Sequence, residues 1–401
     1  MIKNKKGFSL VELLITMVVF LLFMTAASNV FTALLTQFKQ QSKIGETNIE
    51  GIIGLEILRQ DVEGAGYGLP WNVEIDGKSN IALIDGDDWE QLGNYKETSV
   101  NPYGLNDAPS SAPRGIISKN NATFSGSNSI FDGTDYLVIK SVTVAKNGTS
   151  EKWTTLSSTS PYIRIWSSAG ETTPISENLQ NNDTVMVISP AGRYGYLKEL
   201  VTNGTSFSTK FKDVTSTEWR PPDSSVGEID IVYGVDPANN LRMPFNRADY
   251  FILKYQGSND IVPKRCAPNT GVLVKAVVKQ NDGTFEYQPL LDCVADMQVI
   301  FGTDSDGDGF FDPTGGDSYT EDISVLNAEG IRNQLKQVRI YILAHEGQKD
   351  STFEYPSKTV ELGTDIGLGR TFNLDSKIGD PEYKYYRWKL YTIITSPKNL
   401  E

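Results

Sequence analysis

The pattern of apolar and polar positions divides the chain into a helical N-terminal segment and a β-rich remainder. Residues 8–38 are apolar on all sides, and Glu12 is the only charged residue among them. From Lys39 to Glu63, apolar residues recur at helical spacing among Lys, Glu, Gln and Asn. We therefore expect one long helix over residues 8–63, whose first half suits lipid or another apolar surrounding and whose second half packs against a domain.

The second half of this predicted helix is amphipathic. Its apolar stripe consists of Ile44, Ile52, Ile53, Leu55, Leu58 and Val62. Three glycines weaken it, since each costs up to about 1 kcal/mol relative to alanine; they are Gly45, Gly51 and Gly54. The glycine-rich run 64–70 predicts the end of the helix.

After Trp71 the texture changes to short runs of Val, Ile, Tyr and Thr between Gly, Asn, Asp, Ser and Pro, which is typical of antiparallel β structure. The predicted strands are Tyr136–Val144, Tyr162–Trp166, Thr184–Ser189, Ile229–Tyr233, Tyr250–Tyr255, Val272–Val278, Ala295–Phe301, Lys336–Ala344 and Arg387–Thr395. Hairpin turns are expected at Asn147-Gly148, Asn203-Gly204 and 281–283, and a helix over Asp322–Leu335. The predicted fold class is α+β, with the long helix packed on an antiparallel β-rich head over 64–401.

A short basic leader precedes the apolar run and contains Lys3, Lys5 and Lys6. A secretory signal peptide has its small-residue cleavage site after the apolar run, whereas here the small residue Gly7 comes before it. We expect cleavage between Gly7 and Phe8, which removes residues 1–7 and leaves the apolar segment on the mature chain. The positive-inside rule places the leader in the cytoplasm and most of the chain across the membrane.

Glu12 is unusual because a carboxylate inside a membrane-spanning segment costs roughly 2.5–3.5 kcal/mol and generally has a partner. Spanning the hydrocarbon takes about 20 apolar residues, so an anchor explains the length of the segment but not this charge. The natural partner is the positive amine that cleavage creates on Phe8.

Gly7, Phe8 and Glu12 resemble the prepilin signature of type IV pilins and type II secretion pseudopilins. The resemblance implies that an inner-membrane prepilin peptidase cuts after the glycine and that the new N-terminus is methylated. It also implies that the glutamate pairs with a neighbouring subunit's N-terminus during filament assembly. One departure is visible, because many pilins carry a helix-kinking proline in this segment and none occurs here before Pro70.

Further stretches are similar to the PilW/PulJ group of minor pilins. They are 59–67, the strand leading into 304–312, 338–343, 386–392 and 398–400. The resemblance implies a minor pilin that primes or caps a type IV pilus and lies in a tip complex under an adhesin. Its implied partners are other pilins and an inner-membrane assembly platform. The protein would then lie in the inner membrane before assembly and in the extracellular pilus afterwards.

Two alternatives stay open at this stage. One is the J-type minor pseudopilin of type II secretion, although that component is usually smaller than this chain. The other is a filament-borne adhesin or surface-binding module, for which the polar region Trp71–Ser129, with Trp71 and Trp89, is the first place to look.

The amino-acid composition limits the classes of molecule that this protein can bind. The 401 residues include 50 acidic and 37 basic ones, a formal net charge of −13, which argues against a nucleic-acid surface. The two cysteines, Cys266 and Cys293, flank the predicted hairpin, and in an exported chain we expect a disulfide between them rather than two buried free thiols.

The run 304–312 carries alternate aspartates that converge on one point when the chain turns, and Gly309 permits the turn. Hard oxygen ligands at this spacing suit Ca²⁺. The expected ligands are Asp304, Asp306, Asp308, the Phe310 carbonyl and Asp312, with Asp317 or Glu321 completing the shell. The loop is only EF-like, because Gly315 stands where an EF-hand has glutamate; the alternative is an acidic surface turn.

Catalytic signatures are scarce. His345 is the only histidine and ends an apolar strand, where a structural role is the common one. The sequence shows neither a phosphate loop nor a nucleophile elbow. We therefore expect a protein that is not an enzyme.

Overall fold

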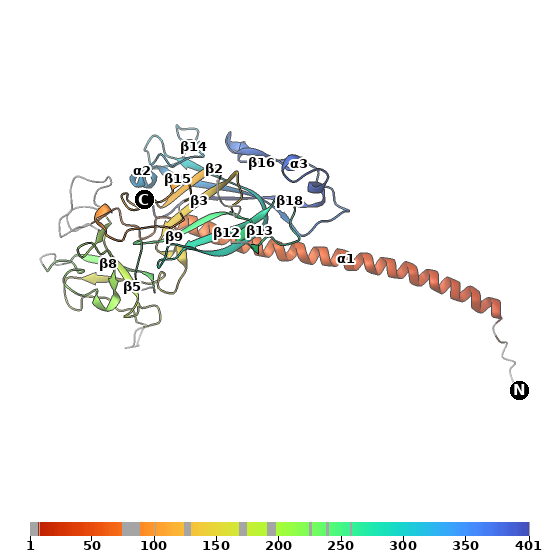
Figure 1. The fold of residues 1–401 in the computed structure, drawn as a ribbon, viewed down its shortest axis with the longest axis horizontal. Coiled ribbons are helices and arrows are strands. Elements are labelled where there is room, and N and C mark those ends of the chain that lie inside the picture. Colours follow the sequence, from red (N-terminus) through yellow and green to blue (C-terminus); the bar gives the residue numbers. More distant parts are fainter. Residues whose placement is uncertain are drawn as a thin grey trace.

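A computed structural model gives the structure of residues 7, 9–73, 89–100, 102–123, 130–167, 175–190, 198–223, 227–237, 240–256 and 259–400. Phe8, one of the predicted processing residues, lies outside them. The fold is a long N-terminal helix joined to a large β-rich head, as the sequence predicts (Figure 1).

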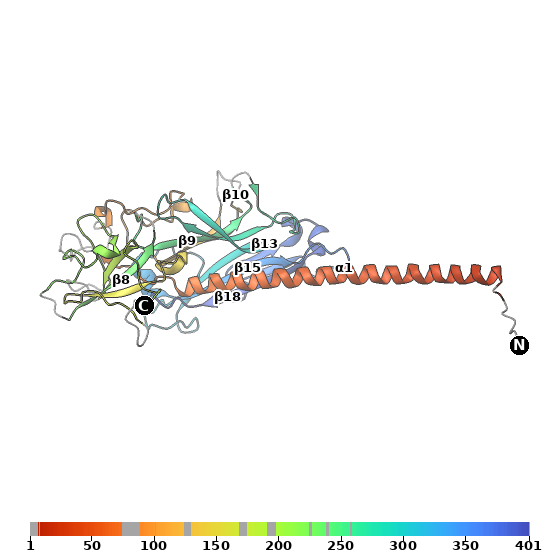
Figure 2. The same ribbon diagram turned by 90° about the horizontal axis from the view of Figure 1, so that it is seen from below.

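Helix α1 runs from Leu10 to Glu63, and Ser9 caps its N-terminus. Its first half extends away from the head, while its second half lies along it, as two perpendicular views agree (Figures 1 and 2). Gly64 takes the C-cap position, so the helix ends at the predicted glycine-rich run. The predicted start, Phe8, lies outside the described residues.

The head is built on an antiparallel eight-stranded main sheet in the order β18-β15-β13-β12-β9-β3-β2, with β14 added to β13. The bounds are β2 Ile116–Ala122, β3 Thr134–Ser141, β9 Asn246–Leu253, β12 Gly271–Val278, β13 Phe285–Thr303, β14 Ser318–Thr320, β15 Leu335–Glu346 and β18 Arg387–Thr395. The predicted turn at 281–283 joins β12 to β13, which pair as a hairpin.

A second sheet has the order β1-β6-β5-β8-β4, with β7 paired to β5. Its strands are β1 Asn72–Val73, β4 Trp153–Ser157, β5 Thr184–Ser189, β6 Glu199–Val201, β7 Thr209–Lys210 and β8 Ile229–Asp236. The pair β1–β6 is parallel, unlike the rest of the sheet. The chain leaves the main sheet after Ser141 and returns at Asn246, its direct partner there. We call residues 142–245 the inserted lobe.

Short elements complete the head. They are η1 Trp89–Gln91, η2 Pro102–Gly104, η3 Thr143–Ala145, η4 Phe211–Asp213, β10 Tyr255–Gln256, β11 Asn259–Asp260, α2 Ala328–Gln334, β16 Thr359–Leu362, η5 Thr364–Ile366, β17 Arg370–Asn373, α3 Leu374–Lys377 and η6 Glu382–Tyr385. Separate apolar clusters lie between α1 and the main sheet, between the two sheets, and beneath the C-terminal segments.

The buried side of α1 differs from the predicted stripe. Leu55, Leu58 and Val62 are buried against the main sheet as expected, but Ile52 and Ile53 are 60% and 58% exposed. Two glycines are buried instead, Gly51 and Gly54. A Cβ built on Gly54 would stand 2.0 Å from the carbonyl oxygen of Leu290. The helix therefore approaches β13 through its glycines, and the isoleucines turn to solvent because small residues permit the closest contact.

Several strand and helix predictions are wrong in detail. Residues 162–166 form only an isolated bridge, Leu156 to Ile163. Asn147-Gly148 is not a hairpin turn, since the flanking β3 and β4 belong to different sheets; the Asn147 side chain instead accepts hydrogen bonds from the N–H groups of Thr149 and Ser150. The helix predicted over Asp322–Leu335 is shorter, because Asn327 caps it and only α2 is helical. Asn203 does form a tight turn, exchanging backbone hydrogen bonds with Ser206.

Candidate functional site

Two residues next to the predicted cleavage site, Ser9 and Glu12, form the N-terminal cap of α1. Ser9 Oγ accepts a hydrogen bond from the Glu12 N–H at 3.2 Å, and a Glu12 carboxylate oxygen accepts one from the Ser9 N–H at 3.4 Å. This is a capping box, which satisfies donors that the first helical turn leaves free. The carboxylate also opposes the positive end of the helix dipole. Glu12 is therefore held in the first helical turn, five residues after Gly7, and is exposed to any neighbour.

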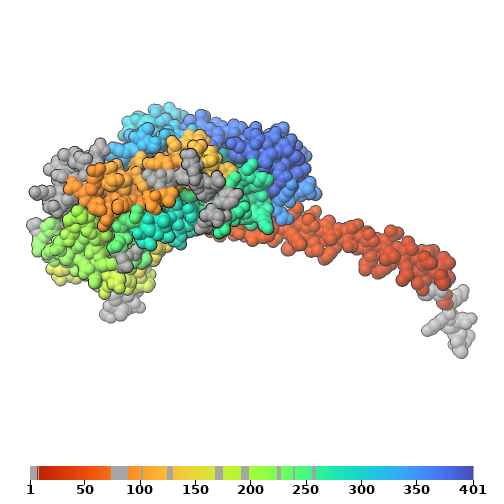
Figure 3. Space-filling model, in the orientation of Figure 1, coloured from red at the N-terminus to blue at the C-terminus, as the bar shows by residue number. Residues whose placement is uncertain are grey.

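The first half of α1 has no intramolecular contact surface. Every described residue from Ser9 to Lys39 is exposed, including large side chains such as Phe20, Phe23 and Leu35. The helix is long and apolar enough to cross a membrane, since residues 10–38 at 1.5 Å each span roughly 45 Å. Figure 3 shows this part standing clear of the head. Such a surface requires lipid or other apolar helices around it.

A buried ion pair fixes the second half of α1 to the head. Asp61 is 4% exposed, and its carboxylate lies 2.5 Å from Lys275 Nζ on β12 and 2.5 Å from the Tyr250 hydroxyl on β9. Burial lowers the pKa of Lys275, and Asp61 opposes that shift. Sequence analysis did not single out Asp61; its signal is its place three residues after Leu58, on the buried side of the helix.

The acidic loop brings three of the predicted calcium ligands together. Carboxylate oxygens of Asp304, Asp306 and Asp317 lie within 4.8 Å of one another. Gly307 and Gly309 have φ of +79° and +91°, a conformation that favours glycine and lets the chain turn around Asp304. Asp304 accepts from both of their N–H groups, at 2.6 and 2.8 Å. Burial opposes the charged form of Asp304, but these donors hold the pKa of its carboxyl below the ordinary value.

The remaining predicted ligands have other local roles. Asp308 accepts from the Phe310 N–H at 2.8 Å, and Asp312 accepts from Thr314. Neither belongs to the group of three carboxylates. Asp317 ties the ends of the loop, because it accepts from the N–H groups of both Ser305 and Asp312. Glu321, the other candidate, points elsewhere and accepts from Asn120 and from the Gly369 N–H.

The predicted disulfide between Cys266 and Cys293 is present and connects the segment before β12 to β13. His345 lies beside it, 3% exposed, and its Nε2 accepts from the Ala267 N–H at 2.8 Å. Burial lowers the pKa of the His345 imidazole to about 3, so the ring is neutral. These contacts are those of a packed core histidine.

The two tryptophans proposed as a ligand-binding region have different environments. Trp89 is 3% exposed and packs on Tyr95 between the two sheets, so it is not a surface residue and that part of the prediction is wrong. Trp71 lines a polar cavity of about 280 Å³. The Lys198 ammonium and the Arg332 guanidinium lie 4.8 and 4.5 Å from its ring.

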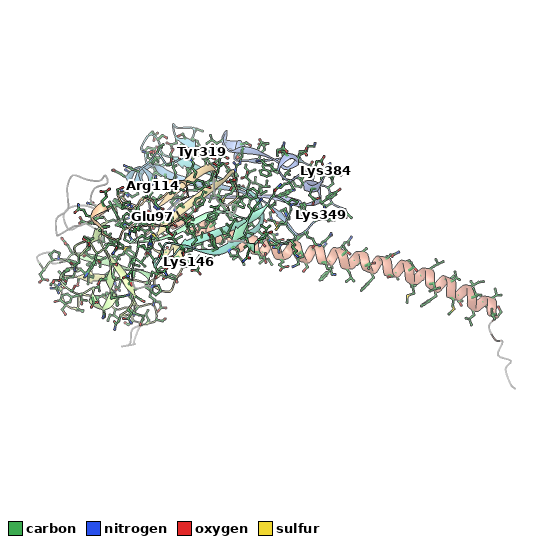
Figure 4. The ribbon with its side chains drawn as sticks, viewed as in Figure 1. Glu97, Arg114, Lys146, Tyr319, Lys349 and Lys384 are labelled. Carbon is green, nitrogen blue, oxygen red and sulfur yellow. A yellow bond between two sulfur atoms is a disulfide. The ribbon has the colours of Figure 1, made fainter. Side chains whose placement is uncertain are left out.

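A buried network of charges, also missed by the sequence analysis, joins the segment 92–115 to the main sheet. Its members are Glu97, Asp107, Arg114, Lys140, Arg247 and Asp249. Figure 4 labels Glu97 and Arg114 in this part of the head. Burial disfavours the Glu97 carboxylate, but Lys140 and Arg247 outweigh it and lower the pKa to about 2. Three acidic and three basic side chains balance, so the interior carries no net charge here.

Comparison with known proteins identifies the N-terminus. Residues 2–28 match the prokaryotic N-terminal methylation motif. A search of curated proteins and a search of solved structures returned no match. The match covers Gly7, Phe8 and Glu12 and the first part of α1. The chain thus carries a prepilin-type N-terminus, which supports processing by a prepilin peptidase, membrane anchoring before assembly and assembly with other pilins in general.

Proposed function

We propose that this protein is a minor pilin of a type IV pilus, which enters the filament, or primes or caps it, after its leader is removed. The observation that carries the proposal is α1 itself. Its half over residues 10–38 is exposed and, apart from Glu12, uncharged, yet it continues without a break into a half whose one side packs against the head. One rigid element thus offers an assembly surface at one end and a folded domain at the other.

In this proposal the inner membrane holds α1 before assembly, with the leader in the cytoplasm and the head outside. Cleavage after Gly7 frees the Phe8 amine, which is then methylated. Moving the helix from lipid into a bundle of apolar helices keeps its side chains out of water. Glu12 neutralises the Phe8 amine of a neighbouring subunit, and the cost of an unpaired charge in an apolar surrounding sets the register between subunits.

The decisive experiment is N-terminal and intact-mass analysis of the protein recovered from sheared surface filaments. We expect a chain that begins at methylated Phe8, at low stoichiometry to the main subunit. A chain that is missing from filaments and still begins at Met1 in the membrane would contradict the proposal. Glu12→Ala should abolish incorporation, whereas Glu46→Ala, an exposed carboxylate on the same helix, should not.

The J-type pseudopilin of type II secretion is the second candidate, because the same N-terminal motif serves both systems. Deleting the gene separates the two: loss of surface pili with normal protein secretion supports the pilin, and the reverse result supports the pseudopilin. An adhesin role has one supporting observation, the polar cavity beside Trp71. Trp71→Ala should then lower surface or glycan binding while filament number stays unchanged.

We also propose that the acidic loop binds Ca²⁺ through Asp304, Asp306 and Asp317, and that the head has no enzymatic activity. A site of this kind outside the cell has a Kd of about 10⁻⁴–10⁻³ M, so 10 mM Ca²⁺ should stabilise the head by about 1–3 kcal/mol. Thermal unfolding with Ca²⁺ and with a chelator measures this. Asp304→Asn should remove the calcium effect, whereas Asp308→Asn should retain most of it, because Asp308 lies outside the group.

A further inference from the structure

The side chain of Lys140 is fully buried in the head. The residue lies within β3 with a side chain that is 0% exposed. Its Nζ is 2.7 Å from a carboxylate oxygen of Glu97 and 2.5 Å from Oδ2 of Asp107. The centroid of the Phe245 ring lies 5.7 Å from this Nζ. A single amine thus touches two carboxylates in a site that water does not reach.

The two carboxylates are held rigidly relative to each other. Oε1 of Glu97 accepts from the backbone N–H groups of Asp107 and Ala108, at 2.8 and 3.2 Å. Arg114 holds both oxygens of Asp107, with its Nε on Oδ1 at 2.6 Å and its backbone N–H on Oδ2 at 2.8 Å. Asp107 Cγ is therefore presented to Lys140 Nζ with little freedom to move, which is the condition that favours reaction between neighbouring groups.

We propose that Lys140 and Asp107 become joined by an amide bond between Lys140 Nζ and Asp107 Cγ, with Glu97 as the proton-transfer residue. Glu97 accepts a proton from the Lys140 ammonium, and the freed lone pair attacks Asp107 Cγ. The bond from Cγ to Oδ2 then breaks. Oδ2 leaves as water with two protons from the former ammonium, one of them delivered through Glu97. One ammonium and one carboxylate become one amide and one water, with no change in oxidation state.

Arg114 and the burial of the ion pair support this reaction. During the attack, negative charge collects on Oδ1, where the Arg114 Nε–H already donates a hydrogen bond. A buried ion pair has a large desolvation cost, and replacing it by a neutral group removes that cost. The remaining charges still balance, because Glu97 and Asp249 stay paired with Arg247, and Arg114 keeps the amide oxygen as an acceptor.

The bond would be a covalent cross-link between the segment 92–115 and the main sheet. Asp107 belongs to the segment 92–115, whose described residues, 92–100 and 102–115, contain one short 3₁₀ helix and no strand, whereas Lys140 is on β3, the strand next to the β2 edge of the main sheet. The disulfide joins different elements, the segment before β12 and β13. The amide therefore fixes a long irregular segment onto the sheet, independently of the disulfide.

Peptide mapping of the full chain, purified from membranes, reduced and unfolded, tests the proposal directly. Trypsin cuts after a free lysine but not after an acylated one. We expect no cleavage after Lys140 and one branched peptide that contains Asp107 and Lys140 and weighs one water less than its two parts. Cleavage after Lys275, which is also buried and ion-paired, serves as the internal control for complete unfolding. Two linear peptides of full mass from the wild-type chain would overturn the proposal.

Two variants test the assigned roles. Glu97→Gln should leave two linear peptides while circular dichroism shows a folded head; a branched peptide in this variant would overturn the role of Glu97. Asp107→Asn should release ammonia instead of water, so its branched peptide should have the same mass as that of the wild type. A branched peptide at another residue would overturn Asp107 as the site.

Discussion

The two halves of α1 are both helical, but only the second half packs against the rest of the chain. The half over residues 10–38 carries large apolar side chains and buries none of them within the chain. The half over 39–63 has fewer apolar residues, yet it contacts β13, β15 and β18 and places Leu58 and Val62 in the core. Hydrophobicity alone therefore does not show which part of a helix is buried in its own domain. Residue size and one buried charge decide that here.

The largest effect is expected from Asp61, the charge that fixes the second half to the head. Asp61→Ala leaves the Lys275 ammonium buried without its carboxylate, which should lower the free energy of unfolding of the head by about 3–5 kcal/mol. Chemical denaturation of the purified protein measures the change. The double variant Asp61→Ala with Lys275→Met should regain part of the loss, and equal loss in both would contradict the ion-pair explanation.

A pair of substitutions on neighbouring turns tests which side of the helix is buried. Leu58 is 0% exposed, so Leu58→Ala should cost about 2–5 kcal/mol. Ile53 is 58% exposed, so Ile53→Ala should change the free energy of unfolding by less than about 0.5 kcal/mol. If the two variants unfold alike, the helix is rotated relative to the arrangement described above.

The glycines offer a second matched pair. Gly54→Ala places a methyl group against the Leu290 carbonyl, and despite the gain in helix propensity we expect a net cost of about 1–3 kcal/mol. Gly45→Ala has no atom within 4 Å of the new Cβ and should stabilise the helix by up to about 1 kcal/mol. Thermal unfolding distinguishes the two signs, and stabilisation by both substitutions would argue against close contact at Gly54.

The smallest effect on stability belongs to the first half, and there a near-zero result is informative. Glu12→Ala removes only the exposed capping-box contact to Ser9, so the unfolding of the head should not change measurably. Incorporation into filaments should nevertheless be lost. If the variant unfolds normally and also assembles normally, Glu12 has no role in assembly.

Local signals in the sequence predicted much of this fold. Strands β5 and β18 have the predicted bounds, because each is a compact run of β-branched and aromatic residues between turn residues. The turn at 281–283, the disulfide and the end of α1 also follow from local chemistry. Of the acidic loop, the sequence predicted the turn and the convergence of Asp304 and Asp306, which depend on residues close together in the chain.

Long-range contacts account for what the sequence did not predict. The exposure of Ile52 and Ile53 depends on where β13 lies, and helical periodicity cannot tell an apolar face packed through glycine from one packed through isoleucine. Strands β5 and β8 were predicted, but not their membership of a second sheet, because strand order depends on contacts between residues far apart in the chain. The partners of Asp61 and Lys140 lie as far as 214 and 43 residues away along the chain. A buried carboxylate or ammonium looks like a surface residue until its partner is known.

The connection of the inserted lobe has a mechanical consequence. Its two ends join the main sheet at Ser141 and Asn246, which are paired neighbours on adjacent strands. A force applied along α1 is transmitted to the head through the contacts of the helix with β13, β15 and β18. A second route leads into the inserted lobe, because the chain continues from α1 into β1, which pairs with β6 of that lobe. Tension along α1 is therefore shared between the main sheet, through side-chain contacts, and the inserted lobe, through the backbone hydrogen bonds of β1.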